Sequence, residues 1–80
     1  MPTSRRALQL LDESIASLEV MAESKEPREP LKLDRLFGDL RSIRRSMRRL
    51  AEAGASANFW RMQRRSVVLM IKIAKHLSTS

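Results

Sequence analysis

Cysteine is absent from this chain of 80 residues, and His76 is its only histidine. Without cysteine the protein has neither a disulfide framework nor a thiolate metal site, and nothing indicates an oxidising compartment. One histidine cannot build a multi-histidine metal cage. We therefore expect no bound metal and no cofactor.

Glycine is scarce as well, and the two glycines lie far apart in the sequence. A glycine-rich phosphate loop is therefore excluded. Asp12 and Glu13 are adjacent, so they cannot face each other across a cleft as a catalytic pair. Asp34 and Asp39 stand among arginines, which keep carboxylates ionised and make them ion-pair partners rather than general acids. We expect no catalytic residue and no enzymatic activity.

Long hydrophobic runs are missing too. The apolar run Val67–Ile71 is far shorter than the roughly 20 residues of a membrane-spanning helix. The N-terminal segment does not have the pattern of a signal peptide, because acidic residues interrupt it at Asp12, Glu13 and Glu19. We expect a soluble intracellular protein, cytoplasmic or nuclear, that is not secreted and has no membrane partner.

Positive charge is abundant but unevenly distributed, and the net charge is +7. Residues 1–30 hold four Lys or Arg and six Asp or Glu, a net charge of −2. Residues 31–80 hold twelve and three, a net charge of +9, and no acid follows Glu52. This asymmetry indicates a nucleic acid, an anionic membrane surface or an acidic protein as the partner.

Apolar residues at helical spacing predict one all-helical domain over the whole chain. The expected helices cover residues 4–23, 31–53 and 58–76, each to within a few residues. Thr3 or Ser4 can cap the first helix, and the two prolines that follow it end it. Gly54 suits the left-handed position after the second helix, and Ser56 or Asn58 can cap the third.

The second helix combines an apolar stripe with a basic face. Its apolar residues recur at spacings of three and four, the period of a packed helical stripe: Leu33, Leu36, Leu40, Ile43, Met47 and Leu50. The interleaved arginines are Arg35, Arg41, Arg44, Arg45, Arg48 and Arg49. At about 100° per residue, four of them lie roughly opposite the stripe: Arg41, Arg45, Arg48 and Arg49. One face can therefore be buried while the other presents guanidinium groups.

The third helix is the most apolar, with an apolar arc of roughly 200° on a helical wheel. A helix so broadly apolar needs cover on more than one side, and we expect two short helices of the same chain to be insufficient. The expected assembly is a symmetric helical homodimer with the third helices near the two-fold axis. The expected interface residues are Phe59, Trp60, Met62, Val67, Met70, Ile73 and Leu77.

The arginine face favours phosphate binding, because guanidinium groups offer forked donors and stay charged at all relevant pH. Six arginines stand against two acids between Leu33 and Leu50, which leaves charge uncompensated within the segment. Gly38 also lies on this face, where the missing side chain lets the backbone approach a ligand. The residues predicted to bind nucleic acid are Arg35, Arg41, Ser42, Arg44, Arg45, Arg48 and Arg49. A solvated helix face remains the plainer interpretation.

Few aromatic residues accompany these arginines. Proteins that bind single strands stack bases on aromatic rings, but Phe59 and Trp60 belong to the core or the interface. Only Phe37 is expected to be exposed near the arginines. The face also lacks the mixture of Asn, Gln and Lys typical of a sequence-reading helix. We therefore expect shape-selective binding of double-stranded RNA, with Ser42 or Ser46 in position to contact 2′-hydroxyls.

Residues 33–44 read Leu-Asp-Arg-Leu-Phe-Gly-Asp-Leu-Arg-Ser-Ile-Arg and resemble the second helix of the RNA-binding domain of the influenza non-structural protein. The likeness lies in three features: the Leu-Asp-Arg-Leu start, which comes just after a proline, the later Asp, and the basic-Ser-aliphatic-Arg order. It implies a three-helix chain that dimerises into six helices and grips double-stranded RNA with its second helices. The implied RNA contacts are Arg35, Arg41, Ser42 and Arg44, with Asp34 and Asp39 holding the arginines in place.

The chain departs from that family's pattern at two places. Gly38 stands where the family has a basic residue central to RNA binding, and Arg45, Arg48 and Arg49 continue a helix where the family's pattern turns. A nodavirus-type helical silencing suppressor is an equally good analogy for the mechanism expected of this chain. The resemblance implies a protein that sequesters duplex RNA as a viral antagonist of host RNA sensing or silencing.

A second hypothesis belongs to a different class. A small helical regulator, of the antiactivator or chaperone type, would bind another protein through the apolar third helix. Four methionines favour it, because methionine suits adaptable interfaces: Met21, Met47, Met62 and Met70. Methionine at helical spacing is also common in ordinary cores, so these residues do not separate the two hypotheses.

Overall fold

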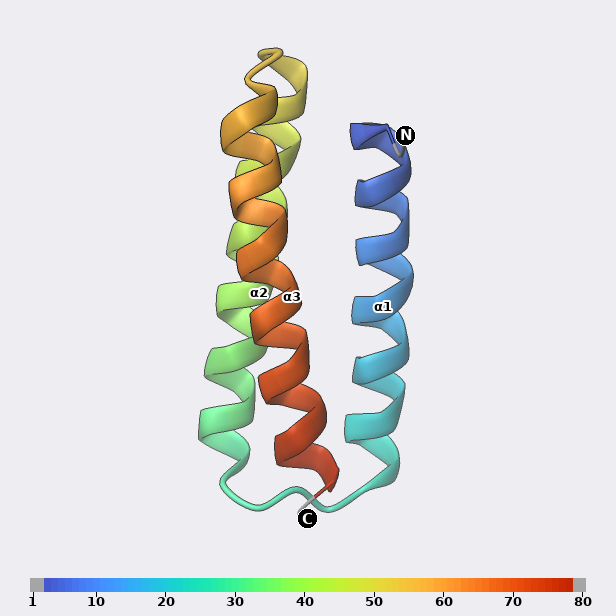
Figure 1. Cartoon of the computed structure of the whole chain (residues 1–80). Helices are drawn as coiled ribbons and strands as arrows, with labels where there is room; N and C mark the ends of the chain where they lie inside the picture. Colours follow the sequence, from blue (N-terminus) through green and yellow to red (C-terminus); the bar gives the residue numbers. More distant parts are fainter. Residues whose placement is uncertain (1–2, 79–80) are drawn as a thin grey trace.

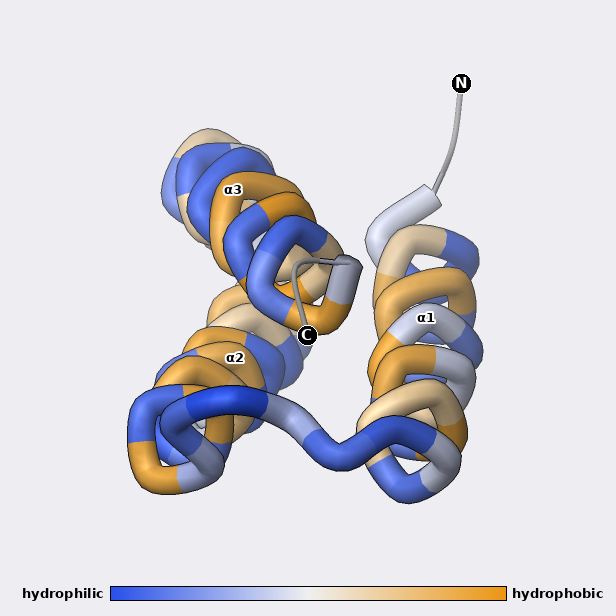
Figure 2. The backbone as a smooth tube through the Cα atoms, turned by 90° about the horizontal axis from the view of Figure 1, so that it is seen from below, coloured by the Kyte–Doolittle hydropathy of each residue, from blue (hydrophilic) through white to orange (hydrophobic). Residues whose placement is uncertain are grey.

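A computed structural model describes residues 3–78, which form three helices and no strand. These are α1 (Ser4–Ser24), α2 (Pro30–Glu52) and α3 (Ser56–Ser78). The predicted all-helical class is therefore confirmed. α1 and α3 run in the same direction, and α2 runs opposite to both (Figure 1). Seen along the bundle, the helices stand at the corners of a triangle (Figure 2).

Local chemistry sets the ends of the first two helices. The Thr3 hydroxyl accepts a hydrogen bond of 3.2 Å from the Arg6 backbone N–H, which confirms one of the two expected caps. α1 ends at Ser24 rather than residue 23, and α2 begins at Pro30, one residue earlier than predicted. Proline suits this first helical position because its missing N–H would have no intrahelical partner. Glu29 precedes it in a left-handed conformation, with φ +51°.

A tight turn joins α2 to α3. Gly54 has φ +74°, as predicted for the residue after the second helix. Its N–H donates to the Ala51 carbonyl at 3.2 Å, and the Ala55 N–H donates to the Leu50 carbonyl at 2.9 Å. Two carbonyls at the end of α2 are thereby satisfied in a Schellman motif. α3 starts at Ser56, so the expected cap by Asn58 is wrong: Asn58 lies within the first turn of the helix.

The core lies along the axis where the three helices meet. The predicted stripe of α2 is confirmed, since Leu33, Leu40, Ile43 and Met47 are buried and its other two leucines pack against the core. The remaining buried apolar residues are Leu11, Ile15, Phe37, Phe59, Ile73 and Leu77. Phe37 is only 5% exposed, so its expected exposure near the arginines is wrong. It follows Leu33 by one helical turn and precedes Leu40 by another, which places it on the buried side.

The apolar arc of α3 is covered within one chain more completely than expected. Phe59, Ile73 and Leu77 are at most 1% exposed, so these three side chains fill the core and offer no surface to a second subunit. Their assignment to a dimer interface is corrected accordingly. α1 and α2 both pack on α3 and together cover this side. Val67, which was also expected at the dimer interface, differs from these three residues because its side chain is 37% exposed.

The bundle is slender, with principal extents of 40 × 18 × 15 Å. Its length follows from helices of 21 to 23 residues at about 1.5 Å per residue. Within residues 3–78, no helix combines the length and the apolar character needed to cross a membrane.

Candidate nucleic-acid interface

The predicted binding residues of α2 do not form one face. Arg41, Arg44 and Arg48 lie on the side toward α1, where the first two bind carboxylates of α1 and the third lines the α1–α2 groove. Ser42 and Arg49 lie on the side toward α3. The remaining two, Arg35 and Arg45, are exposed. The structure therefore places three of these arginines beside α1, one beside α3 and two outside both grooves.

On the α1 side, two arginines are held in ion pairs. Arg44 binds Asp12 through two bonds: Nε donates to Oδ1, and Nη2 donates to Oδ2 at 3.0 Å. This hydrogen bonding raises the pKa of the Arg44 guanidinium above its ordinary value, although partial burial acts in the opposite direction. Arg41 donates to Glu19 Oε1 at 2.5 Å, and its guanidinium lies 5.7 Å from the Phe37 ring centroid.

These pairs differ from those implied by the influenza resemblance. Asp34 and Asp39 were expected to hold the arginines, but Arg41 and Arg44 are held by acids of α1 instead. The reason is geometric: the two arginines face α1, whereas Asp39 lines the opposite groove. The expected role of Asp39 toward these arginines is therefore wrong.

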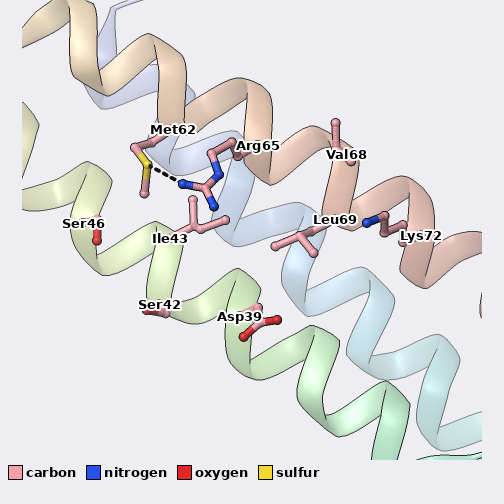
Figure 3. Close-up of a pocket in the computed structure, with 9 residues that line it drawn as sticks. All are labelled: Asp39, Ser42, Ile43, Ser46, Met62, Arg65, Val68, Leu69 and Lys72. Carbon is pink, nitrogen blue, oxygen red and sulfur yellow. Dashed lines mark hydrogen bonds between the residues drawn. The ribbon is translucent and has the colours of Figure 1, made fainter.

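The opposite side of α2 forms a groove with α3, and we call it the basic groove. Two adjoining hollows make it up, and they share Ser46, Met62 and Arg65. Figure 3 shows the first hollow, which is lined by Ser42 and Ser46 of α2 and by Arg65 and Lys72 of α3. The complete lining is Asp39, Ser42, Ile43, Ser46, Arg49, Leu50, Asn58, Arg61, Met62, Arg65, Val68, Leu69 and Lys72.

Positive charge dominates this groove. Four cations line it, Arg49, Arg61, Arg65 and Lys72, against the single carboxylate of Asp39. Among residues 3–78 the ion pairs are Lys32–Glu29, Arg41–Glu19 and Arg44–Asp12, so none of them neutralises a groove cation. Arg65 contacts only a neutral partner here, the Met62 sulfur, at 3.9 Å. The groove cations thus remain available to an anion.

The spacing of these groups suits a phosphate chain. From Arg61 to Lys72 the helix rises about 16 Å, at 1.5 Å per residue. One nucleic-acid strand carries a phosphate about every 3.4 Å along the axis, the value for B-form DNA, so the row spans roughly five phosphates. The hydroxyls of Ser42 and Ser46, on the facing wall, add neutral donors and acceptors.

The cations of α3 were absent from the predicted site. Arg61, Arg65 and Lys72 recur at spacings of four and seven, which places them on one side of a helix. Ser42, Ser46 and Arg49 recur at four and three on α2. Either spacing could have marked a shared side, but the sequence does not tell which helix that side faces.

No group of three or more His, Cys, Asp or Glu residues within residues 3–78 is placed to hold a metal ion. His76 lies near the end of α3, where its Nε2 donates to the Arg28 carbonyl. Its position links α3 to the connection between α1 and α2.

Comparison of the chain with protein-family models, with curated proteins and with solved structures finds no match in any of the three. The likeness of residues 33–44 to the influenza domain therefore stays a prediction from a short motif.

Proposed function

We propose that this protein is a non-catalytic homodimer that binds double-stranded RNA through the phosphate backbone and sequesters it. The observation that carries the proposal is the basic groove between α2 and α3, which is lined by four cations and a single carboxylate. Affinity of such a groove for nucleic acid comes from the release of counterions and is independent of sequence.

The accessibility of aromatic residues supports a duplex rather than a single strand. Phe37 and Phe59 are 5% and 1% exposed, so neither ring is available to a base. Trp60 packs its ring edge-on against Phe59, with centroids 4.9 Å apart. Binding without stacking therefore depends on phosphate and sugar contacts. RNA is preferred over DNA because the shallow minor groove of the A-form helix displays 2′-hydroxyls, which Ser42 and Ser46 are able to contact.

The direct test is a fluorescence anisotropy titration of RNA duplexes of about 20 base pairs, long enough for shape recognition. The variant Arg49→Ala, Arg61→Ala, Arg65→Ala is expected to lose most of the affinity, equally for unrelated duplex sequences. Its plot of log affinity against log salt is expected to flatten by about 0.9 for each phosphate that the variant no longer binds, a scale established for B-form DNA. DNA duplexes and single strands serve as competitors.

A charge-matched control separates the groove from net charge. The variant Arg5→Ala, Arg6→Ala, Lys32→Ala also removes three exposed cations, but none from the basic groove. It is expected to bind nearly as well as the natural chain. An equal loss of affinity in both variants would mean that binding depends on net charge and not on the basic groove. Failure of the natural chain to bind duplex RNA at low salt would overturn the proposal and favour the alternative, a regulator that binds another protein.

A further inference from the structure

A second groove lies between α1 and α3 and is mainly apolar, whereas the basic groove is mainly charged. Its main lining residues are Leu10, Ser14, Ser17, Val67, Ile71 and Ala74. Leu10, Val67 and Ile71 are 44%, 37% and 49% exposed, which is high for large apolar side chains gathered on one side of a bundle. Small residues between them leave the helix backbones approachable.

The two walls of this groove are parallel and in a fixed register. Lys25 Nζ donates to the Leu77 carbonyl at 3.4 Å near one end of the bundle. Ser4 lines one hollow with Phe59 and Trp60 near the other end. Because both helices rise by about 1.5 Å per residue, Ser14 lies at about the height of Val67 in the middle of the groove.

The rims of the two walls also carry opposite charge. On α1, Asp12 and Glu19 bind arginines of α2, so Glu13 is the acid that lines this groove. On α3, which holds no acid, Arg61, Arg65 and Lys72 line the basic groove, and Arg64 does not. The exposed Arg64 stands three residues before Val67 on α3. A second copy is therefore complementary in charge when its α3 lies against the α1 of the first copy and its α1 lies against the α3 of the first copy.

Symmetry decides how a second copy meets this requirement. A two-fold axis perpendicular to the helices places α1 on the partner's α1 and α3 on the partner's α3, which opposes like charges. A two-fold axis parallel to the helices places α1 on the partner's α3 twice. We propose that a second copy of this chain occupies the α1–α3 groove in this parallel arrangement, with Ser14 facing the partner's Val67.

This inference deepens the homodimer of the proposed function and does not depend on RNA binding. It leaves the basic groove uncovered, because Arg61, Arg65 and Lys72 line the side of α3 that faces α2. Its tests contain no nucleic acid, so their failure is distinct from a failure of RNA binding.

Because the chain lacks cysteine, introduced thiols report the arrangement directly. Ser14→Cys and Val67→Cys chains are prepared separately, mixed and oxidised under mild conditions. A disulfide between the two kinds of chain is expected, because such a bond forms only when the Cα atoms lie within about 7 Å. Neither variant alone is expected to cross-link. As the matched control, Val20→Cys, at an exposed site outside the groove, is expected not to cross-link with Val67→Cys.

The outcomes of this experiment are distinct. Disulfides in the Ser14→Cys or Val67→Cys variant alone would indicate the perpendicular axis and overturn the parallel arrangement. No cross-link above that of the Val20→Cys control, together with a monomer in sedimentation velocity at all concentrations, would overturn the second copy as the occupant.

A charge reversal tests the register independently. Glu13→Arg and Arg64→Glu are each expected to weaken dimerisation by about tenfold, since each affects two symmetric contacts on the rim. Together they are expected to restore it, because the charges are exchanged and the attraction is kept. A double variant no tighter than either single variant in sedimentation equilibrium would contradict the pairing of Glu13 with the partner's Arg64.

Discussion

At the scale of single residues, the two glycines have opposite structural roles. Gly54 holds a positive φ of +74° at the end of α2, a conformation that a side chain opposes. Gly38 lies inside α2 with ordinary helical geometry, and a Cβ added there would meet no atom within 4 Å. Nothing in the packing therefore requires glycine at position 38.

Gly38→Ala is expected to raise the free energy of unfolding by about 0.5–1 kcal/mol, because glycine costs entropy inside a helix. Chemical denaturation measures this change. Gly54→Ala is the control and is expected to lower stability by about 1–2 kcal/mol. If Gly38→Ala is stabilising yet weakens duplex binding, the hypothesis that the glycine lets the backbone approach RNA gains support; unchanged binding would remove it.

Leu40 is the residue of the α2 stripe most completely enclosed, with 0% exposure. Leu40→Ala is expected to destabilise the fold by about 2–5 kcal/mol, because apolar surface is no longer buried and a cavity is left behind. Leu31→Ala removes the same atoms from a side chain that is 82% exposed and is expected to change stability by less than about 0.5 kcal/mol. Urea denaturation measures the free energy of unfolding of the two variants. Similar losses of stability would mean that Leu40 is not on the buried side of α2.

At the scale of the helices, α1 holds two arginines of α2 in ion pairs, and under the proposed function these pairs would compete with RNA phosphates. The variant Asp12→Asn, Glu19→Gln releases Arg44 and Arg41 from their ion pairs. Duplex affinity is expected to rise, and the salt plot to steepen by about 0.9 for each arginine that binds a phosphate in consequence. The loss of stability is expected to be small, about 0.2–1 kcal/mol per pair, because these side chains are partly exposed.

The same titration needs a control with an equal change in charge. Glu23→Gln, Glu26→Gln also removes two exposed acids, and neither forms an ion pair within residues 3–78. A rise in affinity no larger than in this control would show that α1 does not restrain the arginines.

The helices themselves were predictable, and their mutual arrangement was not. Apolar spacing located all three helices, and Gly54 and Pro30 set their ends, because these signals are local. The partners of Arg41 and Arg44 were missed because helical periodicity gives the side of a helix but not the neighbour it faces. The basic groove was missed for the same reason: Arg61 and Arg65 of α3 lie across from Ser46 of α2 only because of the way the three helices pack around one axis.

At the scale of the whole molecule, dimerisation is expected to stabilise the fold by mass action. The midpoint of thermal unfolding should rise with protein concentration, because association favours the folded dimer over unfolded chains. Val67→Glu places a charge in the α1–α3 groove and should abolish this dependence, whereas Val20→Glu should keep it, since Val20 lies outside that groove. Circular dichroism melts at several concentrations measure both; a midpoint independent of concentration in the natural chain would argue for a monomer.

The Schellman turn between α2 and α3 also bears on the order in which the chain folds. It joins two long helices whose buried residues make up most of the core, whereas α1 contributes only Leu11 and Ile15. A helical hairpin closed by so short a connection forms its contacts locally and rapidly. We therefore expect α1 to dock last and to open first, so that amide protons in α1 exchange with solvent sooner than those in α2 and α3. A transient opening of that kind would also free the two arginines that α1 holds.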